Sequence, residues 1–156
     1  MKKLVFIFAV LLLGGFISIH AQSSGKKSKK LSSAEKDTLI KANVLFDDGN
    51  YLSSLPIYKR PYENHPEGLP EGLFLQYRIG VCCLYKTDEN ARALEYLTAV
   101  AEKNKKVADV QFYLGRAYML NYKFDEAIEK FTETLKQKNI SHDKKTEAEQ
   151  YILNCN

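Results

Sequence analysis

The sequence predicts an all-α fold: a solenoid of three helix pairs followed by a C-terminal capping helix. Small and large apolar residues recur at helical spacing through residues 33–155. The pattern also repeats along the chain, since Gly80 lies 38 residues after Ala42 and 35 residues before Gly115. The length of 156 residues, 45% of them hydrophobic, is too small for several ordinary domains but sufficient for three stacked units.

Residues 1–21 have the features of a secretory signal peptide. Lys2 and Lys3 precede an apolar run from Leu4 to Ile19, and the small residue Ala21 stands at the expected cleavage point. This run is shorter than the ~20 residues that a membrane-spanning helix needs, although an uncleaved membrane anchor is the alternative. We therefore expect an exported, periplasmic protein, with outer-membrane association as a further option.

Residues 22–32 are expected to form a disordered tether rich in Lys and Ser. Its four lysines either contact an anionic surface or only keep the segment solvated. Without Lys2 and Lys3 the net charge falls from +4 to +2, and without the four tether lysines it falls to −2. This balance gives no indication of a nucleic-acid-binding protein.

Three units follow, about 35–68, 72–105 and 108–141, and each is expected to be a pair of antiparallel helices. In the first, Ser54 and Tyr58 take the small and large places, and Gly49 can adopt a positive φ in the turn. In the third, Asp125 and Glu126 suit the first turn of the second helix, where negative charge meets the positive end of the helix dipole. The small and large residues expected between the paired helices are Ala42, Gly80, Ala93, Gly115, Tyr118, Ala127 and Phe131.

A last helix is expected over residues 142–155. Ala148, Tyr151, Ile152 and Cys155 fall on one face of it. It is either a cap that covers the third pair or the first helix of a further pair. We favour the cap, because a solenoid end needs a polar outer face, and the sequence supplies one with Lys144, Lys145, Glu147 and Glu149.

The order Leu114, Gly115, Tyr118, Ala127 and Phe131 resembles the tetratricopeptide repeat (TPR), which has a period of ~34 residues. The resemblance covers residues 33–155. Residues 113–118 and 121–128, with the closing helix, are further similar to exported TPR modules of Bacteroidota envelope proteins. Those modules precede a β-propeller and an OmpA-like peptidoglycan-binding domain, and some belong to the secretion machinery of gliding bacteria. Neither domain occurs in these 156 residues, so the resemblance gives no basis for wall binding.

The TPR resemblance implies a concave groove lined by the first helix of each pair. The groove residues that it implies are Asn43, Tyr77, Val81, Tyr85, Phe112, Arg116 and Met119, with Leu39, Phe46 and Phe74 as further candidates. Phe46, Phe74 and Phe112 could instead pack between repeats. Tyr77, Tyr85 and Arg116 are preferred, because Tyr and Arg are enriched where binding energy concentrates.

The best-known TPR groove binds a terminal carboxylate through several Lys and Asn residues. Here only Asn43 and Arg116 match that set in kind. A groove of mixed aromatic and polar character that binds an extended or helical segment is therefore the favoured mode.

No motif indicates catalysis, a cofactor or a metal site. The chain contains no CxxC, HExxH or GxSxG motif and no Gly-rich phosphate loop, and His65 and His142 lie far apart in separate connections. The adjacent Cys82 and Cys83 would point about 100° apart on a helix, and Cys155 belongs to a distant helix. We expect three free, mostly buried thiols.

The leading hypothesis is a non-catalytic periplasmic scaffold that binds protein partners of the cell envelope in its groove. Nucleic acid and small-molecule substrates are not expected as partners, and any membrane contact is expected to be peripheral. The alternative is a structural component of an outer-membrane-associated secretion, motility or envelope complex, as a shortened relative of the TPR/propeller/OmpA-like proteins. An enzyme is the least favoured hypothesis.

Overall fold

The computed structural model describes residues 30–65, 68–104, 106–107 and 109–156. The predicted signal peptide, and residues 22–29 of the predicted tether, lie outside this part of the chain. Within it, all regular secondary structure is helical. No helix in these ranges is both long enough and apolar enough to cross a membrane.

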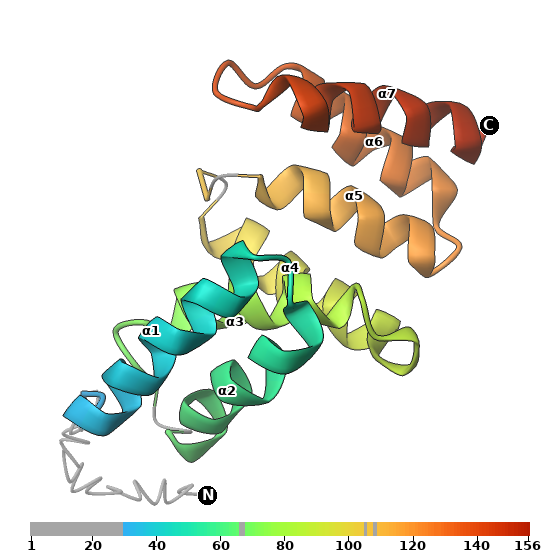
Figure 1. The fold of residues 1–156 in the computed structure, drawn as a ribbon. Coiled ribbons are helices and arrows are strands. Elements are labelled where there is room, and N and C mark those ends of the chain that lie inside the picture. The colour runs from blue at the N-terminus through green and yellow to red at the C-terminus, as the bar shows by residue number, and fades with distance from the viewer. Residues whose placement is uncertain (1–29, 66–67, 105, 108) are drawn as a thin grey trace, which may run out of the picture.

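The helices form three pairs and a final single helix. Their bounds are α1 (Ser33–Asp47) and α2 (Tyr51–Asn64), α3 (Gly72–Cys83) and α4 (Asn90–Lys103), α5 (Val110–Leu120) and α6 (Phe124–Leu135), and then α7 (His142–Cys155), with the short 3₁₀ helix η1 (Thr87–Glu89) before α4. Each helix packs mainly against its neighbours in the chain, and α1 and α7 lie at opposite ends of the stack (Figure 1). The predicted all-α solenoid is confirmed.

The first helix begins at a capping box, in which two residues satisfy each other's backbone N–H groups. The Ser32 hydroxyl accepts a hydrogen bond from the Glu35 backbone N–H at 3.3 Å, and the Glu35 carboxylate accepts one from the Ser32 N–H at 2.8 Å. Just before the cap, Leu31 is only 5% exposed and belongs to the core. The prediction of a tether extending to residue 32 is therefore wrong at its end, because Leu31 and Ser32 are part of the fold.

Glycines allow the paired helices to approach closely. A Cβ placed on Gly115 would lie 2.8 Å from Cδ1 of Phe131 on α6, and one on Gly80 would lie 2.8 Å from Cγ of Leu97 on α4. In the first pair, Ala42 and Ser54 are fully buried in the corresponding places. Ala93 and Ala127 are fully buried as well, whereas Tyr118 is only partly buried. Each pair thus interlocks a small residue with a large one.

The last helix covers the end of the third pair. Ala148 is fully buried, and the Tyr151 ring stacks on the Phe131 ring with centroids 5.2 Å apart. Ile152 and Cys155 also pack against the core. Lys144 departs from the predicted polar outer face, because its ammonium lies 2.6 Å from the Asp109 carboxylate before α5. Asp109 therefore ties α7 back to the start of α5.

Candidate functional site

The centre of the predicted groove is a direct contact between the second and third helix pairs. Arg116 on α5 donates a hydrogen bond from Nη1 to the hydroxyl of Tyr85 at 2.8 Å. Its guanidinium carbon also lies 4.9 Å from the centroid of the Tyr85 ring. Tyr85 directly follows the last turn of α3 and is 40% exposed. The structure thus brings two of the three preferred residues together at a surface open to solvent.

Tyr51, the first residue of α2, packs on the same tyrosine. Its ring stacks on the Tyr85 ring, with centroids 4.1 Å apart and planes inclined by 17°. Burial, followed by the nearby Tyr85 and Tyr113, raises the pKa of Tyr51 to about 12. Sequence reasoning missed Tyr51 because it assigned the groove to the first helix of each pair. The available signal was an aromatic residue placed directly after the turn at Gly49.

Tyr77, the third preferred residue, contacts a different aromatic residue. Its ring centroid lies 6.1 Å from that of Tyr113 on α5, with the planes inclined by 70°. Burial, followed by Tyr113 and Asp109, raises the pKa of Tyr77. Burial, followed by Tyr85, raises the pKa of Tyr113 to about 12. We call Tyr51, Tyr77, Tyr85, Tyr113 and Arg116 the tyrosine–arginine cluster.

The cluster continues to the last helix through a cation. The ammonium of Lys144 lies 5.5 Å from the centroid of the Tyr113 ring and pairs with Asp109 at 2.6 Å. A cation over an aromatic face is attracted by the ring quadrupole. The contacts of the cluster therefore extend over α3, α5 and α7, with Tyr113 itself buried in the core and Tyr85 exposed.

A separate group of residues lies where the first helix pair meets α3. The amide oxygen of Asn43 accepts a hydrogen bond from the Tyr58 hydroxyl at 2.7 Å. Arg78, which sequence reasoning did not select, places its guanidinium 4.0 Å from the Phe46 ring centroid and 5.1 Å from that of Phe74. Asn43 and Phe46 thus take part in internal contacts, whereas Phe74 is 39% exposed.

Two predicted groove residues are corrected by their burial. Val81 has no exposed surface, and Phe112 is 2% exposed. Val81 lies within an unbroken buried stretch over residues 79–84, so the C-terminal end of α3 is covered on all its faces. Phe112 packs against Phe131 and Tyr151, at 6.1 and 6.2 Å between ring centroids. Both residues support the stack and offer no surface to a partner. Leu39 is also buried, and Met119 is partly buried.

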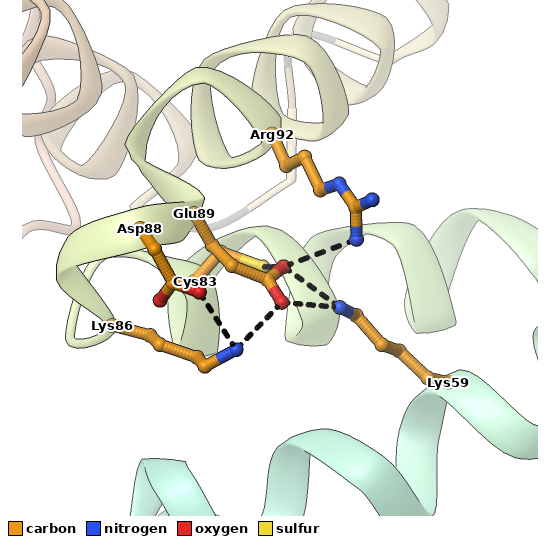
Figure 2. Close-up of polar contacts among 6 residues, drawn as sticks. All are labelled: Lys59, Cys83, Lys86, Asp88, Glu89 and Arg92. Atoms are coloured by element: carbon orange, nitrogen blue, oxygen red, sulfur yellow. Dashed lines mark hydrogen bonds and ion pairs between the residues drawn. The ribbon is translucent and has the colours of Figure 1, made fainter.

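A second polar cluster, which sequence reasoning did not predict, surrounds the nearly buried carboxylate of Glu89 (Figure 2). The ammonium of Lys59 on α2 donates hydrogen bonds to both carboxylate oxygens, at 2.8 and 2.7 Å. Lys86 donates another at 3.1 Å, and Arg92 lies 3.7 Å away. The thiol of Cys83 donates to the same carboxylate at 3.3 Å.

These contacts hold Glu89 in its ionised form. Burial raises its pKa, but the hydrogen bonds from Lys59, Cys83 and Lys86 outweigh that effect and lower the pKa to about 2. The Lys59–Glu89 pair joins α2 to the start of α4 across 30 residues of sequence. We call Lys59, Lys86, Asp88, Glu89 and Arg92 the Glu89 cluster. No spacing pattern within one repeat predicts this cluster, because Lys59 and Glu89 come from different helix pairs.

All three thiols are free. Cys82 and Cys83 are buried, and Cys155 is partly buried. Burial raises the pKa of Cys82 to about 11, and burial together with the hydrogen bond to Glu89 raises that of Cys83 to about 12. Thiols in these states are poor nucleophiles. In the part of the chain that the structure describes, no three His, Cys, Asp or Glu side chains come together as a metal site would require.

The arrangement defines a class: an α-solenoid of TPR-like helix pairs with an aromatic and cationic cluster where its pairs meet. No family model matches the chain. The chain is 33% identical over 81 residues to "Tetratricopeptide repeat protein 1" of Schizosaccharomyces pombe. That match covers 51% of this chain but 7% of the relative. The helical architecture and this distant similarity both fit a TPR protein.

Proposed function

We propose that the chain is a non-catalytic scaffold that binds a partner protein through the tyrosine–arginine cluster. The observation that carries this proposal is the solvent-open contact between Arg116 and Tyr85, which spans two helix pairs. The similarity to a TPR protein supports the same function, since solenoids of this kind offer extended concave binding surfaces.

The chemistry of the cluster indicates how a partner segment would be held. Arg116 donates to the neutral hydroxyl of Tyr85, and among the ion pairs of the described residues none includes Arg116. Its other N–H groups can therefore meet carbonyl or carboxylate oxygens of a partner. The tyrosine rings add large, rigid contact area with a polar end. An extended or helical segment fits such a surface.

We also propose that the protein acts in the periplasm. The support is the N-terminal sequence, in which Lys2 and Lys3, the apolar run and Ala21 have the order of a secretory signal. Cell fractionation followed by determination of the N-terminal residue tests this. A mature protein that begins at Gln22 in the periplasmic fraction is the expected result, and a full-length cytoplasmic protein would contradict it.

A second candidate function is a structural part of an outer-membrane-associated secretion, motility or envelope complex. It is favoured by the resemblance of residues 113–118 and 121–128 to modules of Bacteroidota envelope proteins. Sedimentation separates the two candidates. A structural part should sediment with outer membranes in a large assembly, whereas a free scaffold should stay in the soluble periplasmic fraction.

The binding proposal is tested by crosslinking in the native cell envelope, followed by capture with purified variants. The double variant Tyr85→Ala with Arg116→Ala should lose the crosslinked partner while its melting profile stays close to that of the wild type. Arg60→Ala, an exposed position on α2, is the matched control and should retain the partner. Retention by the double variant would refute the assignment of the groove.

A further inference from the structure

A pocket between the second and third helix pairs lies on the face of α5 opposite Arg116. It has a volume of about 200 Å³ and is lined by residues of α4, α5 and α6. From α5 it takes Gln111, Leu114 and Tyr118, which recur at helical spacing on one face. Arg116 comes two residues after Leu114, about 200° round the helix, and so belongs to the opposite face. The pocket shares no lining residue with the tyrosine–arginine cluster.

Gln111 brings an unmade hydrogen bond to this pocket. The residue is only 6% exposed, and its amide oxygen is buried without a hydrogen-bond partner among the residues that the structure describes. Most buried polar atoms in folded proteins have a partner, so this exception calls for one. An amide oxygen is an acceptor, and the last torsion of a glutamine side chain is broad. The oxygen can therefore turn towards a donor that enters the pocket.

The charged residues that line the pocket leave an excess of one negative charge. They are two carboxylates, Glu102 on α4 and Glu133 on α6, against the single ammonium of Lys130 on α6. That ammonium lies 2.7 Å from the Glu129 carboxylate and farther, 3.3 Å, from that of Glu133. In the part of the chain that the structure describes, no ion pair includes Glu102. A cation that enters the pocket therefore meets carboxylate charge that Lys130 does not neutralise.

The apolar walls suit the stem of a long side chain. Ala101 and Leu114 are almost completely buried, and Tyr118 is partly buried. Lysine and arginine lay their methylene stems along apolar surface of this kind while the charged end reaches a polar partner. Pockets for drug-sized ligands have volumes of about 300–1,000 Å³, so this smaller pocket fits a single side chain.

We propose that this pocket binds a lysine or arginine side chain of a partner protein. The stem of that side chain packs on Leu114 and Tyr118. Its ammonium or guanidinium donates hydrogen bonds to the Gln111 amide oxygen and to the carboxylates of Glu102 and Glu133. The excess negative charge selects against an acidic side chain, and the unpartnered acceptor selects against an apolar one. The pocket gives the scaffold a second contact face that does not depend on the groove.

The test uses the full chain without its first 21 residues and blocked five-residue peptides, each with one test residue between two pairs of alanines. The test residues are lysine, arginine, norleucine and glutamate, and the amide spectrum of the isotope-labelled protein is recorded during each titration. The lysine and arginine peptides should shift the side-chain amide signal of Gln111 and should bind less tightly as salt rises, because added ions screen the interaction.

Two results of these titrations would overturn the proposal. One is binding of the norleucine or glutamate peptide as tight as that of the basic peptides. The other is a shift of the Gln111 signal by spermidine but by neither basic peptide, which would make the pocket a site for free amines rather than for a protein side chain.

Variants locate the site. Gln111→Leu should weaken the lysine peptide by about tenfold, and its melting temperature should not fall, because the change removes an unpartnered buried polar group. Glu102→Gln combined with Glu133→Gln should also weaken the peptide by about tenfold. Glu149→Gln, at an exposed position on α7, is the matched control and should bind the peptide as the wild type does.

Arg116→Ala separates the pocket from the groove. It should leave the lysine peptide bound as in the wild type, since Arg116 lies on the other face of α5. Loss of the peptide in Arg116→Ala but not in Gln111→Leu would place the lysine in the groove and refute the pocket. If neither basic peptide binds while Tyr85→Ala with Arg116→Ala still loses its crosslinked partner, the pocket is refuted and the proposed function stands.

Discussion

The ring of Phe131 lies directly against Gly115, so closely that a Cβ on the glycine would meet Cδ1 of the ring at 2.8 Å. Phe131 is fully buried and also stacks on Tyr151 of α7, which limits how far its ring can move aside. The contact explains why the helical pattern contains a glycine at this place. It also makes the third pair sensitive to a single added methyl group.

We predict that Gly115→Ala destabilises the protein by about 1–3 kcal/mol, the usual cost of overpacking a core. The better helix propensity of alanine offsets only about 0.5–1 kcal/mol of this. Chemical denaturation measures the difference.

Gly72→Ala is the matched control, because Gly72 begins α3 and a Cβ there would meet nothing within 4 Å. This variant should be as stable as the wild type or slightly more stable. A Gly115→Ala protein of wild-type stability would show that the two helices can separate without cost.

We predict that Glu89→Gln destabilises the protein by roughly 3 kcal/mol, because it leaves the charge of the mostly buried Lys59 without its partner. Glu129→Gln, which alters an exposed pair with Lys130, should cost less than about 1 kcal/mol. Equal effects in the two variants would mean that the Glu89 cluster does not hold the first two pairs together.

The same carboxylate predicts an acid transition. The pKa of Glu89 is about 2 in the folded protein, below its ordinary value of 4.5. Its contribution to the free energy of unfolding is therefore complete above pH 4.5 and is lost as the pH falls from 4.5 towards 2. Denaturation curves across this range should show a smaller loss in Glu89→Gln than in the wild type.

At high pH we expect the tyrosines to destabilise the fold. The pKa values of Tyr51 and Tyr113 are about 12, above the ordinary 10, because the fold favours their neutral forms. Ionisation of these two tyrosines should leave the free energy of unfolding unchanged below pH 10 and should lower it as the pH rises from 10 to 12. A spectroscopic titration should show fewer than the ten tyrosines of the chain ionising before unfolding begins. Ionisation of all ten in the folded protein would contradict this.

Thiol labelling should distinguish the three cysteines. Cys82 and Cys83 are buried, with pKa values raised to about 11 and 12, whereas Cys155 is partly exposed near the end of α7. A thiol reagent at mildly alkaline pH should modify Cys155 first, and the other two only after unfolding. Cys155→Ser should remove the fast reaction, and fast labelling that persists in this variant would show that the core opens readily.

The sequence was sufficient to predict the helix pairs because their signal is local. Gly115, Phe131 and the turn between them lie within one short stretch, so helical spacing alone relates them. The groove was predicted less well. Val81 is on the helix face that the pattern indicates, but neighbouring helices cover it, and how far they do so depends on the way the pairs stack.

The contacts between pairs could not be predicted, for a related reason. Arg116 reaches Tyr85 across 31 residues, and Lys59 reaches Glu89 across 30. Judged from its own helix alone, each of these side chains could equally well point into solvent. Which of these side chains meet depends on how the helix pairs are placed relative to one another. The sequence pattern within one repeat does not indicate that placement.

The dominance of contacts between consecutive helices has a mechanical consequence. A force that pulls α1 and α7 apart would act on the interfaces in series, so the weakest one yields first and the others remain closed. The chain would then lengthen in separate steps rather than in one rupture. A protein held between two partners through its ends could in this way act as an extensible link whose sections close again when the tension is released.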